Sequence, residues 1–564
     1  MKKLRWQLII IFLTGLVVGL LLLSEQPGSF QSLSPEPVRG GVYVEGLVGS
    51  LQRLNPLLDF YNSVDRDVNR LIYSGLIRFD GRGVPQPDLA ESWGFSKDGT
   101  IYNFELRPNI KWHDGEPVTS QDVLFTIDLM REENDIVPAD LQTFWKEVEV
   151  IAPSDTTLQF KLPEPFAPFL DYLSFGVLPQ HLLGDRSFAE IVESPFNLQP
   201  VGSGPFRFDQ LIVEDNEIKG VSLSVFEDYY AQKPYIEQIV FRYYPDSAAA
   251  FAAYQDGAVQ GISQVTPDVL PEVLAAPDLA VYTGRRPQLT MVLFNLNNPQ
   301  VPFFQEKDVR FAFLKGLNRR WIVDNLMGGQ AILANGPIFP GTWAYYDDLK
   351  PVDYDPENAV VLLKEAGYTV ADEAEAVRKK EDVSLAFTLL HPDDDQHRLI
   401  AEHIQNEWEK LGARVELEAV PYEELINGRL VPRSYQAALV DLNLSRSPDP
   451  DPYPFWDQAQ ATGGQNYSQW DNRNASEYLE QARITADMGE RARLYRNFQF
   501  VFNEEMPALP LYYPVYTYAV DRKIQGVSMG PLFDTSDRFE TVLNWFVLAR
   551  VPTQQGGVGI TATP

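Results

Sequence analysis

The stretch LAESWGFSKDGTIYNFELRPNIKWHDGEPVTSQDVLFTIDLM, residues 89–130, decides the fold of this chain. Asp98-Gly99 is a tight-turn dipeptide, and residues 101–107 alternate apolar and polar side chains, which is typical of a half-buried strand. Thr119, with Asp122 three residues later, makes a capping-box pattern that predicts the start of a helix. The stretch therefore predicts a strand, a turn and a helix. It contains no nucleophile beside a base, so it indicates a scaffold without visible catalytic chemistry.

Through the segments LAESW, DGT, FELR and WHDGEPVT, this stretch resembles the peptide- and nickel-type family of extracellular solute-binding proteins that serve ABC importers. Further motifs of the resemblance are Leu54-Asn55-Pro56-Leu57, Leu71-Ile72-Tyr73-Ser74-Gly75-Leu76, Pro200-Val201-Gly202-Ser203-Gly204-Pro205-Phe206, Phe294-Asn295, Asp308-Val309-Arg310, Gly336-Pro337-Ile338, Trp343-Ala344-Tyr345 and Asp449-Pro450-Asp451-Pro452-Tyr453. The resemblance implies an α/β fold with two lobes, of the large periplasmic-binding-protein type. In that fold the first lobe carries an extra subdomain, and the second lobe is inserted between parts of the first.

The length of the chain also favours several domains, because 564 residues exceed what one hydrophobic core usually serves. The expected division is a signal anchor or transmembrane segment at residues 1–23, a linker at 24–39, lobe 1 at 40–285 with the extra subdomain at about 80–195, lobe 2 at 286–510, a return to lobe 1 at 511–550, and a tail at 551–564.

The N-terminus has the pattern of an export or anchoring segment. Lys2, Lys3 and Arg5 precede an uncharged apolar run over residues 6–23. The run is near the short end of what spans a bilayer, and no small-residue cleavage site follows it cleanly. We expect an uncleaved anchor, with a cleaved signal peptide as the alternative. The positive-inside rule places everything after Ser24 outside the cytoplasm.

Composition excludes several classes of function. The chain has 47 Lys and Arg against 78 Asp and Glu, a net charge of −31, which argues against nucleic acid and against an anionic lipid surface as partners. Cysteine is absent, so disulfides, thiolate metal sites and the lipid-modified cysteine of many bacterial members of the resembled family are excluded. We expect a monomer.

Helix and strand patterns alternate through the second half of the chain. Residues 308–317 and 400–411 have apolar side chains at helical spacing, and 415–419 alternates as a strand. Around residues 283–294 the sequence predicts one buried strand. A short helix over 245–257 is predicted to pack through Ala249, Phe251 and Ala252. Helix followed by strand, repeated, favours an α/β lobe.

No metal site or cofactor is predicted. His391, His397 and His403 are spaced by six residues, which turns successive side chains away from one another on a helix. Many relatives carry a calcium-type loop where this chain has residues 372–382, which lack glycine. The carboxylates of Asp449 and Asp451 are interpreted as a solvated acidic loop, since sequence cannot show the separation that a hydrolase needs.

The resemblance places the ligand between the lobes. Peptide-binding relatives hold the ligand's α-amino group with an aspartate three residues before the acid-proline motif, but this chain has Arg446 there. A guanidinium suits carboxylate or phosphate, so an anionic or neutral polar ligand is favoured; alternatively Arg446 caps a loop. The residues expected to bind the ligand are Asn55, Trp343, Tyr345, Asn443, Arg446, Asp449, Tyr453 and Asn466.

The function expected from the resemblance is that of the substrate-binding receptor of an ABC importer. It would capture a small solute, oligopeptide-like or otherwise polar, and deliver it to the permease subunits without changing it. Two alternatives stay open: an exported hydrolase with two cleft carboxylates, and a ligand-sensing module without transport.

Overall fold

The computed structural model describes residues 37–370, 377–445 and 448–548. The predicted anchor, most of the linker, Arg446, part of the calcium-type loop and the tail lie outside these ranges. Within these ranges, none of the helices combines the length and the apolar composition that a membrane span requires.

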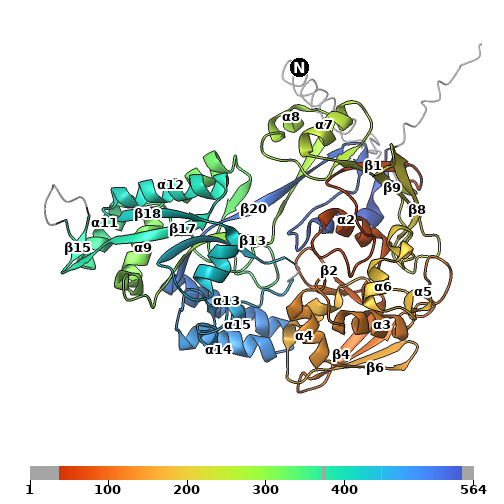
Figure 1. The fold of residues 1–564 in the computed structure, drawn as a ribbon, viewed down its shortest axis with the longest axis horizontal. Helices are drawn as coiled ribbons and strands as arrows, with labels where there is room; N and C mark the ends of the chain where they lie inside the picture. Colours follow the sequence, from red (N-terminus) through yellow and green to blue (C-terminus); the bar gives the residue numbers. More distant parts are fainter. Residues whose placement is uncertain (1–36, 371–376, 446–447, 549–564) are drawn as a thin grey trace, which may run out of the picture.

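A sheet of twelve strands runs through both lobes (Figure 1). Its order is β18-β17-β19-β13-β20-β11-β1-β10-β9-β8, and β12 and β14 also pair with β20. Strand β20 (Ala508–Asp521) pairs at its start with β13 of one lobe and at its end with β11 and β12 of the other. The two lobes are therefore joined through a shared strand.

Lobe 1 surrounds the end of the sheet formed by β1, β10, β9 and β8. Its elements are β1 (Val42–Val48), α2 (Ser63–Ile72), β2 (Ile77–Phe79), β3 (Pro85–Pro87), β8 (Phe206–Glu214), β9 (Glu217–Val225), β10 (Gln238–Tyr244), α7 (Ser247–Gln255), β11 (Gly261–Ile262), α8 (Leu270–Ala275), β12 (Leu279–Arg285), and, after β20, β21 (Ile524–Gln525), η7 (Thr535–Phe539), η8 (Val542–Asn544) and β22 (Phe546–Val547).

A separate four-stranded sheet, in the order β4-β5-β7-β6, belongs to the same side of the molecule. The elements of this part are β4 (Ala90–Phe95), β5 (Ile101–Leu106), α3 (Ser120–Arg131), α4 (Ala139–Glu147), β6 (Glu149–Ser154), β7 (Thr157–Lys161), η1 (Ala167–Leu173), α5 (Gln180–Leu183), α6 (Phe188–Val192) and η2 (Pro195–Leu198). The strand, turn and helix predicted from residues 89–130 are β5 and α3. The capping box is present, because Asp122 accepts the Thr119 backbone N–H at 2.8 Å.

Lobe 2 surrounds β13, β17, β18 and β19. Its elements are β13 (Gln288–Phe294), η3 (Pro302–Gln305), α9 (Lys307–Lys315), α10 (Arg319–Trp321), the π-helix η4 (Ile322–Leu326), β14 (Ala331–Leu333), α11 (Pro356–Glu365), β15 (Lys379–Lys380), β16 (Val383–Ser384), β17 (Ala386–Pro392), α12 (Asp395–Lys410), β18 (Arg414–Val420), the π-helix η5 (Glu424–Leu430), β19 (Ala437–Asn443), α13 (Tyr453–Trp456), η6 (Gln458–Gln460), α14 (Arg473–Ile484) and α15 (Met488–Glu505).

Two large apolar cores correspond to the two lobes. One buries side chains of β1, α2, the four-stranded sheet and the segment after β20, and the other buries side chains of β13, α9, α12, β17, β19, α14 and α15. The two-lobed α/β architecture implied by the resemblance is confirmed.

Two local predictions are wrong. Residues 283–294 form two strands, β12 and β13, because Pro287 has no backbone N–H and the chain passes from one lobe to the other there. Helix α7 buries Ala250, Phe251 and Ala253, whereas the predicted contact residue Ala252 is exposed. Helix α7 packs against β1, β10 and β11, and this contact buries the face that carries Ala250 and Ala253.

Candidate functional site

The lobes meet where backbone N–H groups of two lobe 2 loops donate hydrogen bonds to lobe 1. The Asp449 N–H of lobe 2 donates to the carboxylate of Asp171 in η1 at 2.9 Å. The Trp343 N–H donates to the Arg82 carbonyl at 2.9 Å. Loops of lobe 2 that carry predicted ligand-binding residues therefore touch lobe 1 directly.

Behind this contact lie two ion pairs of lobe 2. Asp449 is buried and pairs with Arg491 of α15, and it also accepts the Tyr495 hydroxyl at 3.0 Å. Asp451 pairs with Arg483 of α14 at 3.0 Å. The interpretation of these two carboxylates as a solvated acidic loop is wrong, because helices α14 and α15 supply a guanidinium to each.

Burial and charge together set the protonation of this group. Burial, added to by the Asp449 charge, raises the pKa of Asp171 well above its usual range. Burial raises the pKa of Asp451 to about 6, against the opposing charge of Arg483. Burial alone lowers the pKa of Arg491, but the Asp449 charge outweighs it and the pKa is raised. The contact between the lobes therefore takes up a proton more readily than free aspartates do.

Aromatic rings extend the same contact. The Arg491 guanidinium lies 5.2 Å from the Trp343 ring, and that ring lies 5.7 Å from Tyr495. Arg483 lies 4.3 Å from the ring of Tyr453 in lobe 2 and 5.2 Å from Phe166, which precedes η1. Arg483 thus stacks on one ring from each lobe.

A cavity of about 10 Å³, room for about one water molecule, lies beside the lobe contact. Its lining is mostly apolar and consists of Pro337, Phe339, Thr342, Leu444, Pro448, Pro450 and Phe533. The walls come from the 337–342 loop, from the residues after β19 and from the segment after β20.

Trp343, Asp449 and Tyr453, three of the predicted ligand-binding residues, lie together at the contact between the lobes. Asn443 is exposed at the end of β19, where its side chain accepts the Ser445 N–H at 2.9 Å.

Two predicted residues lie away from this contact. Asn55 is fully buried in lobe 1, bonded to Asn197 and to the Leu57 N–H, both at 3.0 Å. Asn466 is buried in lobe 2 and donates to the carbonyls of Asp457 and Trp470.

Several groups near the junction were not predicted. Asp171, Arg483 and Arg491 are among them, and no local pattern marks them. At the carboxyl ends of β17 and β19, His397 lies between Asp394 at 2.6 Å and Asp441 at 3.2 Å. Burial lowers the pKa of this histidine, but the two carboxylates outweigh burial and raise it. Tyr345, which was predicted, lies near Arg285 and Asn335, which were not.

Across the described residues, no group of three or more His, Asp or Glu side chains is placed to hold a metal ion. His391 is buried in β17, and the ring of His403 stacks on Trp321 at 4.3 Å between centroids.

The family model described as bacterial extracellular solute-binding proteins, family 5 Middle, matches residues 84–466. The dipeptide-binding protein of Escherichia coli (strain K12) is 28% identical over 510 residues, which cover 86% of this chain and 91% of that protein. The oligopeptide-binding protein AppA of Bacillus subtilis (strain 168) is 26% identical over 538 residues, or 93% and 97%. Among solved structures, HbpA2 from Haemophilus parasuis has a TM-score of 0.79 at 22% identity, covering 90% of this chain and 100% of that one. The chain belongs to the bacterial extracellular solute-binding proteins of family 5.

Proposed function

We propose that this protein is the substrate-binding receptor of an ABC importer, and that it captures an oligopeptide-like or other polar solute between its lobes. One observation carries the proposal. Charged and aromatic side chains of both lobes converge where loops of lobe 2 touch lobe 1, on a chain whose family consists of solute-binding proteins. The names of the dipeptide- and oligopeptide-binding relatives support the peptide class of ligand.

The connections between the lobes suit a hinge. Strand β20 and the short link between β12 and β13 pass from one lobe to the other (Figure 1). Hinge closure around a ligand is established for periplasmic binding proteins. A ligand that touches both lobes only in the closed form shifts the population toward that form by its differential contact energy. Micromolar affinity needs about 8 kcal/mol, which a few stacked rings and hydrogen bonds supply.

The proposal includes partners and location. The receptor acts as a monomer, delivers its solute to permease subunits, and is tethered outside the cytoplasm by residues 1–23. The extracellular family and the basic residues before the apolar run support this arrangement.

The rival hydrolase would need two carboxylates that are free to act on a substrate. Asp449 and Asp451 are each paired with an arginine, which argues against such chemistry at this contact. A sensory module shares the fold, and neighbouring genes for permease and ATPase subunits would favour transport over sensing.

Native mass spectrometry of the purified full-length chain tests the proposal. We expect a small-molecule adduct that is released on denaturation and rebinds with an unchanged mass. A mixture of di- and tripeptides incubated with the protein should be recovered intact. Cleaved peptides would favour the hydrolase, and the absence of any adduct or rebinding would contradict the receptor.

A further inference from the structure

Arg285 lies at the junction of the lobes. Its guanidinium uses little of its hydrogen-bonding capacity. It is the last residue of β12, and its carbonyl accepts the Leu532 N–H at 3.1 Å. Within the described residues, the Nη1 group reaches only the Pro340 carbonyl, at 3.5 Å, and the buried Nε has no hydrogen-bond partner. No carboxylate of the described residues forms an ion pair with it. A partly buried cation in this state is costly unless another group completes its contacts.

Other buried arginines of this chain show how unusual Arg285 is. Arg310 donates to the carbonyls of three residues, at 2.5 to 2.9 Å, and Arg319 likewise donates to three, at 2.6 to 2.8 Å. Arg538 binds two carboxylates. These guanidiniums hold the fold together, and each makes at least three hydrogen bonds. Among the described residues, Arg285 has no comparable set of partners.

Two further polar groups lie beside Arg285. The Asn335 side-chain oxygen is buried, and no described residue donates a hydrogen bond to it. Burial raises the pKa of Tyr345, and the Asn335 side chain and the Arg285 charge oppose that shift, which places all three residues in one neighbourhood. A Cβ on Gly341, whose φ is +86°, would lie 2.7 Å from Arg285 Nη1. Glycine therefore lets the 335–345 loop approach the guanidinium closely.

We propose that the Arg285 guanidinium and the Tyr345 hydroxyl form a subsite that binds a carboxylate of the captured solute. A guanidinium presents parallel N–H groups that match the two oxygens of a carboxylate, and the Tyr345 hydroxyl adds a donor. Arg285 comes from the last residue of a lobe 1 strand, whereas Asn335 and Tyr345 come from a lobe 2 loop. An anion bound here contacts both lobes and stabilises their association. This inference rests on the proposed function, because it assigns part of the same solute to the junction.

The first experiment detects the anion site without knowing the solute. The Nε–Hε resonance of Arg285 is recorded by ¹H–¹⁵N NMR on the full-length protein, assigned by its loss in Arg285→Gln, while acetate replaces chloride at constant ionic strength. We expect a saturable shift of this resonance at millimolar acetate. The resonance of Arg286, which lies in the link between β12 and β13, is the control and should not shift. An Arg285 resonance that acetate leaves unmoved overturns the inference.

The second experiment uses trialanine and its C-terminal amide as probes in calorimetry. We expect the amide to bind the wild type about 10- to 100-fold more weakly than trialanine, and Arg285→Gln to remove that difference. Arg286→Gln should keep it. If neither peptide binds although acetate shifts Arg285, the peptide class in the proposed function is wrong and the anion site stands. If the wild type binds both peptides equally, the peptide class stands and the subsite is wrong, a result that needs no folded Arg285 variant.

Discussion

Gly202, in the motif at residues 200–206, packs against the backbone of Ile72 too closely for a side chain. A Cβ on Gly202 would lie 2.0 Å from the Ile72 carbonyl oxygen, so the loop must keep a glycine there. We expect Gly202→Ala to lower the free energy of unfolding by about 2–4 kcal/mol, because the backbone must shift. Urea denaturation followed by tryptophan fluorescence measures it. Gly94→Ala is the matched control, since no atom lies within 4 Å of its added Cβ. Equal stability of the Gly202 variant and wild type would contradict this packing.

His113 holds the same loop and makes a pH prediction. Its ring accepts the Gly202 N–H at 3.2 Å and bonds the Gly204 carbonyl at 3.0 Å, so the folded ring is neutral. Burial lowers the pKa of His113 from 6.5 to about 4. As pH falls from 6.5 to 4, His113 becomes protonated in the unfolded chain but stays neutral in the folded chain. The stabilisation present above pH 6.5 is therefore lost, by up to about 3 kcal/mol.

The measurement is the urea midpoint of wild type and His113→Asn at several pH values in this window. The variant should be less stable at neutral pH but should lose less stability on acidification. An identical pH dependence in both proteins would show that His113 is not the group responsible.

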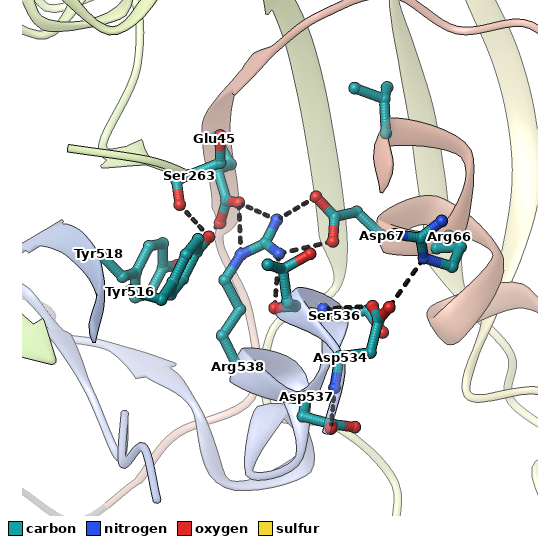
Figure 2. A network of polar contacts seen from close by, with 12 residues as sticks. Glu45, Arg66, Asp67, Ser263, Tyr516, Tyr518, Asp534, Ser536, Asp537 and Arg538 are labelled. Carbon is teal, nitrogen blue, oxygen red and sulfur yellow. Dashed lines mark hydrogen bonds and ion pairs between the residues drawn. The ribbon is translucent and has the colours of Figure 1, made fainter. Parts of the chain in front are cut away.

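At the scale of elements, Arg538 joins four pieces of lobe 1 (Figure 2). The guanidinium lies in η7, 2.7 Å from Glu45 of β1 and 2.6 Å from Asp67 of α2. Glu45 also accepts the hydroxyls of Tyr43 and Tyr518, both at 2.7 Å, which attaches strand β20 to the same network.

Arg538→Met should therefore destabilise the protein by about 3–5 kcal/mol at neutral pH, because two carboxylates stay buried without their cation. Burial already raises the pKa of Asp67 to about 6 in the presence of Arg538. Below that pH Asp67 takes up a proton, so the loss should shrink on acidification. Thermal unfolding at neutral and acidic pH tests this, with Arg538→Met/Asp67→Asn as the variant expected to recover stability. A loss that is constant with pH would argue against the buried-charge explanation.

Elements with strong local signals could be predicted from sequence. Asn62 and Asp355 cap α2 and α11 with their own side chains, and the α12 pattern ends at Gly412 with φ +91°. The break between β12 and β13 was missed although Pro287 marks it, because the surrounding apolar run resembles one strand. The Arg491–Asp449 ion pair could not be predicted, because nothing in the sequence near α15 indicates which loop its arginine contacts.

At the scale of the whole molecule, the two-lobed plan followed from the family resemblance, whereas contacts between lobes could not be predicted. Asp171 and Asp449 are 278 residues apart, and no periodicity relates them. The site shows the same limit: Trp343, Asp449 and Tyr453 belong to recognisable motifs, but Asp171 and Arg285 lie outside them. The residues that complete a junction between lobes are set by how the lobes pack.

Closure of the two lobes can be followed with dyes attached to introduced cysteines, because the chain has no cysteine of its own. Leu274 of α8 in lobe 1 and Leu399 of α12 in lobe 2 are 64% and 41% exposed, and they take dyes as Leu274→Cys and Leu399→Cys. We expect trialanine to raise energy transfer between them. A pair within lobe 2, Val361→Cys and Leu399→Cys, should not respond. Unchanged transfer in the first pair at saturating trialanine would contradict hinge closure.

Asp171 should make this closure depend on pH. Burial and the Asp449 charge raise the pKa of Asp171 in the lobe contact, so the contacting form binds a proton more readily than the separated form. Contact between the lobes should therefore become more favourable as pH falls toward the raised pKa. Asp171→Asn keeps an acceptor for the Asp449 N–H without the charge. The dye-labelled variant should show more high-transfer molecules at neutral pH and a flatter pH response than the wild type. A variant with the wild-type pH response would assign the effect to another titratable group of the contact, such as Asp451, whose pKa burial raises to about 6.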